Sequence, residues 1–262
     1  GTVASRIFVG PDAGEMACGE FGPGRMAEPE EIADAIAAAL SGDTYIDASG
    51  PLSGKHVLIT AGPTREPIDP VRYLSNHSSG KQGYAIAGAC AALGAKVTLV
   101  TGPTALSVPH GVSAVRVETA REMLSACEAA LPAAVFIAVA AVADWRPAET
   151  GDKKIKKDGS APAPLALAEN PDILKTISGH KNRPGLVIGF AAETDNVTNH
   201  AQAKLARKGC DWIIANDVSG DVMGGDENTM ILITADGAQT WPRQSKAKAA
   251  QKLALTLSKA LT

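Results

Sequence analysis

Short apolar segments alternate with alanine-rich helical segments from Lys55 to the end of the chain, and this alternation constrains the fold more than any other feature. Its clearest member is the continuous apolar run over residues 135–142, which is typical of a parallel strand buried on both faces. Strands that alternate with helices predict an α/β fold with a Rossmann-like, doubly wound and mainly parallel sheet. A hairpin over residues 230–242, turning at Asp236 and Gly237, is expected to add a small antiparallel part.

The elements predicted from Lys55 onward are short and closely spaced. Strands are expected at residues 56–60, 96–100, 115–118, 135–142, 186–190 and 212–215. Helices are expected at residues 84–93, 120–131, 171–178, 200–209 and 245–261. Ligands bind beyond the carboxyl ends of the strands in such sheets, and the polar loops of this sequence fall at those ends.

The first fifty residues have a different pattern. A glycine-rich stretch over residues 14–25 is followed by one clear helix, expected at residues 30–40 with Pro29 at its start. So short a segment cannot bury a core of its own. We therefore expect two parts, residues 1–50 as the end of another domain with a linker and residues 51–262 as one α/β domain.

Composition excludes several classes of protein. The net charge of −3 leaves no basic stripe for nucleic acid and no polybasic anchor for a membrane. No apolar run approaches the roughly 18 residues of a spanning helix, and no signal peptide opens the chain. The four cysteines fit no zinc or CxxC spacing, and Cys90 and Cys127 are expected to be small buried thiols. These features favour a cytoplasmic protein with reduced thiols.

A long polar loop over residues 62–83 directly follows the first predicted strand and precedes a helix. An unstructured loop of roughly 20 residues is uncommon in a compact domain and usually has a function. Its small residues, Ser78, Ser79 and Gly80 among them, would leave backbone N–H groups free to bind an anion at the helix N-terminus. The alternative is an ordinary surface loop that ends in a serine or asparagine helix cap. The loop is neither a Walker A motif nor a GxGxxG fingerprint.

Two further motifs follow the central strand. Asp144, in AAVADWRP at residues 140–147, is placed to hold a metal ion or a polar part of a ligand, or else to cap the next turn. The lysine run KKIKK at residues 153–157 fits two interpretations equally well, a solvated surface or a flexible flap that closes over a triphosphate.

The remaining candidates lie in the second half of the domain. ENPDIL at residues 169–174 begins a helix, and Phe190 ends a strand where it can stack on a base or simply pack in the core. Lys204 and Lys208 lie four residues apart on one helix face, as phosphate ligands or as ordinary surface lysines. No Ser/His/Asp set and no His/Cys metal cluster emerges, so nucleophilic or zinc-dependent hydrolysis is not expected.

Taken together, these motifs resemble the phosphopantothenoylcysteine synthetase family of coenzyme A biosynthesis. The segments that carry the resemblance run in order from Lys55 to Thr262: ITAGPTREPIDPVRYLSNHSSGKQG, AAVADWRP, KKIKK, ENPDIL, GFAAET and IIANDVS. The segment MACGEFGPGRMAEPEEI, residues 16–32, resembles the end of the flavin-dependent decarboxylase that bacteria fuse in front of this synthetase. The chain is thus similar to a bifunctional synthetase/decarboxylase without the decarboxylase body, and FMN is expected only in that missing part.

The resemblance implies a ligase reaction in two steps. CTP activates 4′-phosphopantothenate to an acyl-cytidylate with release of pyrophosphate, and the amine of L-cysteine then expels CMP. Acyl-nucleotide formation depends on positioning two anions and neutralising charge rather than on a protein nucleophile. A Mg²⁺ ion is expected to bridge the triphosphate, with Asp144 as the candidate ligand.

The resemblance also implies roles for individual residues. Arg72, Asn76 and Ala141 correspond to the phosphopantothenate site, Asn76 and Lys154 to catalytic residues of the synthetase, and Cys18 to the catalytic cysteine of the decarboxylase alone. The CTP site corresponds to Ser78, Ser79, Gly80, Ala138, Val139, Ala140, Asp144, Lys154, Asp172, Ile173, Leu174, Lys175, Phe190, Lys204 and Lys208.

The family resemblance implies a homodimer, for which the hairpin at residues 230–242 is a candidate element. Two other functions stay open on the residues alone. An ATP-using ligase would share the motifs, and the α/β fold by itself permits a nucleotide-sensing or NAD(P)-binding module without turnover.

Overall fold

A computed structural model of the chain describes residues 12–15, 21–26, 29, 32, 50–156, 164–193, 197–217 and 227–261. The chain divides into two compact units, Gly1–Asp47 and Ala48–Thr262. In the first unit, strands β1 (Asp12–Glu15) and β2 (Phe21–Arg25) pair antiparallel. Cys18 and most of the helix predicted over residues 30–40 lie outside the described residues.

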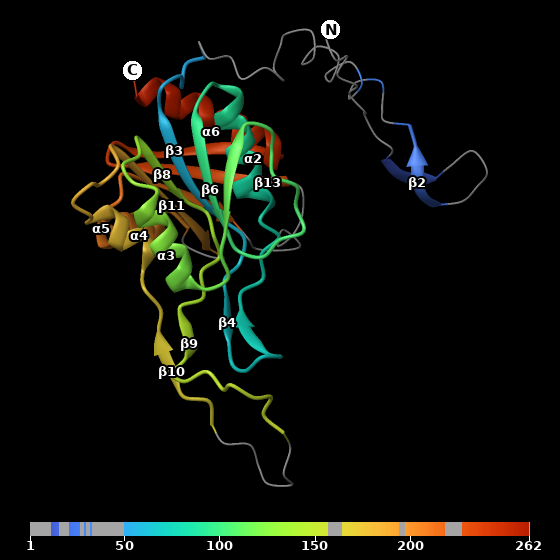
Figure 1. Cartoon of the computed structure of the whole chain (residues 1–262). Helices are drawn as coiled ribbons and strands as arrows, with labels where there is room; N and C mark the ends of the chain where they lie inside the picture. Colours follow the sequence, from blue (N-terminus) through green and yellow to red (C-terminus); the bar gives the residue numbers. More distant parts are fainter. Residues whose placement is uncertain are drawn as a thin grey trace, which may run out of the picture. The chain divides into compact units, whose positions relative to one another are not determined.

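The second unit is built on an eight-stranded sheet with the order β14-β13-β12-β11-β8-β3-β6-β7 (Figure 1). The strands are β3 (His56–Ala61), β6 (Lys96–Thr101), β7 (Val112–Arg116), β8 (Val135–Ala138), β11 (Leu186–Glu193), β12 (Trp212–Asp217), β13 (Glu227–Thr234) and β14 (Gly237–Ser245). The neighbours from β12 to β7 pair parallel, and β13 and β14 pair antiparallel at one edge. This confirms the predicted doubly wound, mainly parallel sheet with an antiparallel addition.

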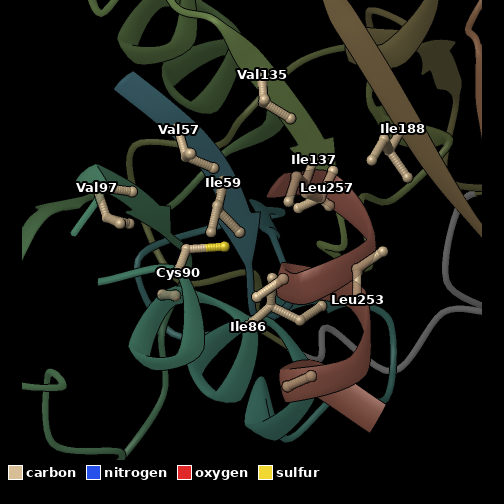
Figure 2. Close-up of a cluster of buried hydrophobic side chains, with 14 of the residues drawn as sticks. Val57, Ile59, Ile86, Cys90, Val97, Val135, Ile137, Ile188, Leu253 and Leu257 are labelled. Carbon is tan, nitrogen blue, oxygen red and sulfur yellow. The ribbon is translucent and has the colours of Figure 1, made fainter. Parts of the chain in front are cut away.

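Helices cover both faces of the sheet. The helices are α2 (Lys81–Ala92), α3 (Ala120–Ala129), α4 (Ile173–Ser178), α5 (Val197–Lys208) and α6 (Lys246–Ala260). In β3, Val57 and Ile59 face α2 and α6, whereas Leu58 faces the layer of α3, α4 and α5. The period of two along the strand thus makes two apolar cores, one on each face. Figure 2 shows the first, where Ile86 of α2 and Leu253 of α6 meet the strands.

Local capping explains where several helices begin. Thr119 and Glu122 form a capping box at α3, each side chain accepting a hydrogen bond from the other residue's backbone N–H. Ser245 caps α6 by accepting from Lys248 N, and Asp172 caps α4 by accepting from Lys175 N. Each such cap stabilises the fold by about 1 kcal/mol.

The cysteines confirm the expectation of buried thiols. Cys90 and Cys127 are fully buried and not in disulfides, and Cys210 is also buried and free. Burial raises the pKa of the Cys90 and Cys127 thiols to about 12, so neither forms a thiolate near neutral pH. Within the part of the chain that the structure describes, no helix combines the length and apolar character needed to cross a bilayer.

Several boundaries differ from the sequence-based expectation. The predicted long strand over residues 135–142 is wrong beyond Ala138, where β8 ends. Beyond this point Ala141 and Pro63 form one isolated parallel bridge, with Ala141 N–H donating to Gly62 O at 2.9 Å, so the chain still runs beside the loop after β3 but no longer forms a regular strand. Ala140 and Val142 line a cavity instead of continuing the strand.

The loop over residues 62–83 is also more ordered than its composition indicates. It holds a two-stranded hairpin of β4 (Arg65–Pro67) and β5 (Tyr73–Ser75), and α2 begins at Lys81 instead of residue 84. A second unpredicted pair, β9 (Trp145–Pro147) and β10 (Leu167–Glu169), lies beside the first hairpin, as Figure 1 shows. Strands of three residues leave almost no periodic signal in a sequence.

Candidate active site

The strand order places a crevice between β3 and β8. Chain connections run outward from β3 through β6 to β7, and in the other direction from β8 through β11 to β12. This is the point of an open α/β sheet where the loops after neighbouring strands diverge and a ligand can enter. The two loops are tied together at their bases, because Thr64 N–H donates to Ala141 O at 3.3 Å. Thr64 Oγ1 also accepts from Ala143 N at 3.0 Å.

A cavity of about 360 Å³ opens at this crevice. It gathers these residues of the expected nucleotide site: Ala138, Ala140, Asp144, Asp172, Ile173, Leu174, Phe190, Lys204 and Lys208. Further lining residues had no individual role in the sequence analysis, although all but Thr60 belong to the AAVADWRP and ENPDIL motifs: Thr60, Val142, Ala143, Trp145, Glu169, Asn170 and Pro171. Five separate segments of the chain therefore meet in one cavity: Thr60 of β3, residues 138–145, residues 169–174, Phe190 of β11, and Lys204 and Lys208 of α5.

The cationic part of the cavity is held by α5. Lys204 Nζ donates to Phe190 O at 2.8 Å, and Lys208 forms an ion pair with Asp172. Burial raises the pKa of Asp172, but the hydrogen bonds from Lys208 and from Lys175 N–H outweigh it, and the net pKa lies below the usual value. The carboxylate therefore stays charged and keeps Lys208 at the cavity, where the two ammonium groups can attract a phosphate chain.

Phe190 lies where the cavity meets the core. It lines the cavity and also packs against the core cluster on the side of α2 and α6. Gly189, directly before it, allows α4 to approach, since a Cβ there would lie 2.6 Å from Leu174 Cδ2. The ring is half-buried, so its exposed part can contact a ligand in the cavity while its buried part stays packed against the core.

Asp144 follows β8 at the mouth of the cavity and is exposed. Its backbone O accepts from Asn170 N at 2.8 Å, and Asn170 Nδ2 donates to Ala143 O at 2.9 Å. The Asp144 carboxylate makes no hydrogen bond or ion pair with any described residue, so capping of a turn is not its role there.

These donors suit Mg²⁺, which binds through one or two carboxylates and the oxygens of a phosphate substrate. Glu169 provides a second carboxylate in the lining. In the ranges the structure covers, no three His, Cys, Asp or Glu side chains gather into a group that could hold a metal ion.

The loop after β3 meets the cavity through Asn76, whose Nδ2 donates to Val142 O at 3.0 Å. Ser78 and Ser79 instead line a second cavity of about 640 Å³ with Arg65, Pro103, Thr104, Ala105 and Leu106. Gly80 is the N-cap of α2, with φ of 76°, and no side chain caps the helix. The interpretation as a serine or asparagine cap is therefore wrong, because the N-cap residue is a glycine and makes no side-chain cap hydrogen bond.

The remaining expected residues lie outside the first cavity. Arg72 pairs with Asp69, and Lys154 is exposed at the surface. Among the described residues, Val139, Ala141 and Lys175 neighbour lining residues in the sequence but do not line the cavity themselves. The structure thus brings together the expected nucleotide residues of β8, α4, β11 and α5, and leaves the expected acyl-transfer residues on exposed loops.

Residues 52–261 match the model of the DNA/pantothenate metabolism flavoprotein C-terminal domain. Over 248 residues the chain is 46% identical to the coenzyme A biosynthesis bifunctional protein CoaBC of Haemophilus influenzae. This alignment covers 94% of this chain and 60% of that protein. It is 45% identical to CoaBC of Escherichia coli K12 over 251 residues, with 93% and 60% covered. The chain therefore spans about three fifths of the length of these curated relatives.

A solved structure described as the C-terminal domain of a CoaBC protein has the same fold. It superposes with a TM-score of 0.70 at 41% identity and covers 81% of this chain and 98% of that chain. The resemblance seen in the motifs is thus confirmed at the level of the family: this chain belongs to the family of the DNA/pantothenate metabolism flavoprotein C-terminal domain.

Proposed function

We propose that residues 51–262 form a phosphopantothenate–cysteine ligase that uses CTP. The observation that carries the proposal is the convergence of Asp144, Asp172, Phe190, Lys204 and Lys208 on one cavity at the switch point of the sheet. A cationic helix face, an aromatic ring and a carboxylate that can hold a metal are the groups that a nucleoside triphosphate requires. The family, and relatives whose names place them in coenzyme A biosynthesis, support the choice of substrate.

The proposed reaction has two steps. The carboxylate of 4′-phosphopantothenate attacks the α-phosphate of CTP, forming an acyl-cytidylate and releasing pyrophosphate. The amine of L-cysteine then attacks the acyl carbon, forms the amide and expels CMP. A protein nucleophile is not needed, which agrees with thiols that are buried and protonated in Cys90 and Cys127.

On the nucleotide side, Phe190 stacks on the cytosine while Lys204 and Lys208 bind the phosphate chain. When bound, Mg²⁺ neutralises charge on the triphosphate, and Asp144 holds it. The backbone at Ala138 and Ala140 lies at the end of β8, between the base and the reacting groups. Asp172, Ile173 and Leu174 at the start of α4 line the nucleotide side of the cavity, and Lys175 follows them in the same helix.

On the acyl side, Asn76 contacts the acyl group, because its amide already lies against Val142 at the cavity. Ser78 and Ser79 offer hydroxyl donors to phosphate oxygens, and Gly80 at the start of α2 lets the loop turn there. Arg72 and Ala141 bind phosphopantothenate. Lys154 neutralises the charge that develops in the reaction, so its contribution is to turnover more than to nucleotide binding.

The test is a stoichiometric assay of the purified protein with Mg²⁺. Pyrophosphate release is expected to require 4′-phosphopantothenate and CTP, and CMP release is expected only once cysteine is added. With all three substrates present, the two products are expected in equal amounts. Absence of both products would contradict the ligase. ATP that competes with CTP and supports equal turnover would select the ATP-using alternative, and tight nucleotide binding without turnover would select the sensor.

We also propose that the domain functions as a homodimer. Exposed apolar side chains gather on the two small hairpins and the segments beside them: Val71 (59% exposed), Tyr73 (48%), Trp145 (50%), Leu165 (44%) and Leu167 (47%). β4 and β9 lie side by side, and both hairpins extend from the same end of the sheet (Figure 1). An exposed apolar group of this kind marks a protein interface, and a two-fold axis would pair it with its own copy.

Sedimentation equilibrium tests the dimer. Leu167→Glu is expected to weaken association by at least about 100-fold, because a carboxylate in an apolar interface loses its hydration. Leu255→Glu on α6 changes a residue of similar exposure, 49%, and should leave association unchanged. If both variants associate equally strongly, the interface does not include the β9–β10 hairpin, and the edge hairpin of β13 and β14 is the next candidate.

A further inference from the structure

The carboxylate of Asp69 binds two segments of the chain at once. Its side chain is fully buried at the turn between β4 and β5. Oδ1 accepts from Val71 N and Arg72 N, both at 2.9 Å, and this closes the turn. Oδ2 accepts from Arg72 Nε at 3.0 Å, from Arg72 Nη2, and from Ile155 N at 3.1 Å. The first oxygen would suffice for the turn, so the second serves a contact with residues far away in the sequence.

Arg72 completes that contact. Its Nη2 also donates to Ile155 O at 3.0 Å, so both backbone polar groups of Ile155 are held by one ion pair whose carboxylate is buried. Upstream, Gly151 N donates to Ile68 O at 2.9 Å and Thr150 Oγ1 donates to Pro67 O at 3.2 Å. Residues 150–155 therefore run along the β4–β5 hairpin and are fixed most firmly at Ile155.

The ion pair is permanent at physiological pH. Arg72 holds the pKa of the Asp69 carboxyl well below its usual range, and the backbone N–H groups of Ile155, Val71 and Arg72 act in the same direction. A charged, fully hydrogen-bonded carboxylate that is shielded from water fixes its partners more tightly than an exposed pair does. Lys154, the residue directly before the clamped peptide, remains exposed.

We propose that Asp69 and Arg72 form a clamp on Ile155 that positions Lys154 for the reaction. The role assigned to Lys154 rests on the proposed function, whereas the clamp itself rests on the contacts above. Asp69 is a positioning residue, since it touches neither cavity. Arg72 can take part in both roles, because its Nη1 donates to no described residue and its side chain is 47% exposed.

Asp69→Asn separates the clamp from the turn. The asparagine Oδ1 can still accept from Val71 N and Arg72 N, whereas Nδ2 replaces the oxygen that faces three donors. Asp152→Asn is the matched control, since it makes the same chemical change on an exposed carboxylate three residues from Ile155. Thermal unfolding of both variants establishes that the domain remains folded.

Amide hydrogen exchange at residue resolution tests whether the Ile155 N–H is hydrogen-bonded, independently of enzyme activity. In the unaltered protein, Ile155 N–H should be protected at least about tenfold more than the N–H groups of Lys154 and Lys156. Asp69→Asn should remove about tenfold or more of that protection and leave Gly151 N–H, which donates to Ile68 O, unchanged. Unprotected Ile155 in the unaltered protein overturns the clamp even if the variant fails to fold.

Kinetics then test whether the clamp positions Lys154. Asp69→Asn should lower kcat for CMP release by about 10- to 100-fold and change KM for CTP by no more than about twofold. In the background of Lys154→Gln, Asp69→Asn should have almost no further effect, because the positioned group is already absent. Asp152→Asn should match the unaltered enzyme.

The outcomes distinguish the two proposals. Full additivity of Asp69→Asn and Lys154→Gln, or an unchanged Ile155 amide in Asp69→Asn, overturns the clamp and leaves the ligase standing. If the unaltered protein releases neither CMP nor pyrophosphate, the ligase fails, while the exchange experiment still decides whether the clamp exists.

Discussion

The two sides of the candidate site are built in different ways. The strand–helix side (Asp172, Phe190, Lys204 and Lys208) lies on elements whose opposite faces are core, such as α5, where Ala201 is fully buried. The loop side consists of Asn76, Ser78, Ser79 and Lys154, all exposed on loops or beside small hairpins.

This difference separates binding from chemistry. Groups on rigid elements are already in place for a ligand, so they bind at a small entropic cost. Exposed groups on loops make their strongest contacts only when the substrates are present, which favours effects on turnover. We therefore expect substitutions on the strand–helix side to change nucleotide affinity and substitutions on the loop side to change kcat.

The largest effect is expected on the loop side, from Lys154→Gln. Turnover should fall by about 100- to 1,000-fold because charge in the transition state loses its counter-charge. The dissociation constant for CTP, measured by titration calorimetry, should change little, since Lys154 does not line the cavity. Lys153→Gln is the neighbouring control and should remain active. Equal losses of turnover and affinity would remove the distinction between the two sides.

The backbone support of the loop side can be broken by Gly102→Ala. A Cβ at this position would lie 1.7 Å from Pro63 O, so the loop after β3 or the end of β6 must move. We expect the free energy of unfolding in urea to fall by about 1–3 kcal/mol, together with a loss of kcat. At Gly179 the nearest atom lies at 3.6 Å, and Gly179→Ala should cost less than about 0.5 kcal/mol. Similar costs for both would mean that the loop base is not tightly packed.

On the strand–helix side, Phe190→Leu sharpens the comparison. Leucine keeps apolar contact with the core but cannot stack, so CTP affinity should fall by about tenfold. Loss of stability should stay below about 1.5 kcal/mol, because the volume is nearly conserved. Calorimetric titration with CTP and urea unfolding measure the two quantities. A large loss of stability with unchanged affinity would restrict Phe190 to core packing.

The smallest effect concerns the Asp172–Lys208 ion pair and appears in the pH dependence of stability. The pKa of Asp172 is lowered in the folded state. The contribution of its ion pair to the free energy of unfolding is therefore fully present above the pKa of the unfolded state, about 3.9. It is lost as the pH falls through the lower, folded-state pKa. Because the pair is partly exposed, the contribution is about 0.5–1 kcal/mol.

Urea unfolding of Lys208→Met measures that contribution. The variant should be less stable than the unaltered protein at pH 6, and the difference in the free energy of unfolding should shrink as the pH falls below about 4. Asp69 is unaltered in both proteins and so cancels in the comparison. A difference that is constant over this range would mean that Lys208 stabilises by packing and not by charge.

Much of the fold could be predicted from the sequence because its elements have strong local signals. The edge hairpin of β13 and β14 follows from the Asp236–Gly237 turn, and α6 follows from its apolar period and the Ser245 cap. The β4–β5 and β9–β10 hairpins could not be predicted, since strands of three residues are stabilised by tertiary contacts. The length of β8 was overestimated because a cavity lining and a buried strand are equally apolar.

The same limit applies to the site. Asp144, Phe190 and Lys208 could be proposed from motifs at strand and helix ends. Thr60 could not, because inside a strand it has the appearance of a structural residue; its Oγ1 in fact accepts from Val139 N and Ala140 N, at 3.2 and 3.3 Å. Asn170 lies within a recognised motif, ENPDIL, yet only the structure relates it to Ala143.

The sequence by itself determined the class of sheet, the approximate elements and the family, because periodicity, turn residues and motifs are properties of the chain. The tertiary structure alone decided which residues share a cavity, that Gly80 leaves α2 uncapped, and that Asp69 and Arg72 hold Ile155 across more than eighty residues. Such contacts depend on how separate segments pack, since hydrogen bonds between distant groups form only after the sheet and its helices have brought them together.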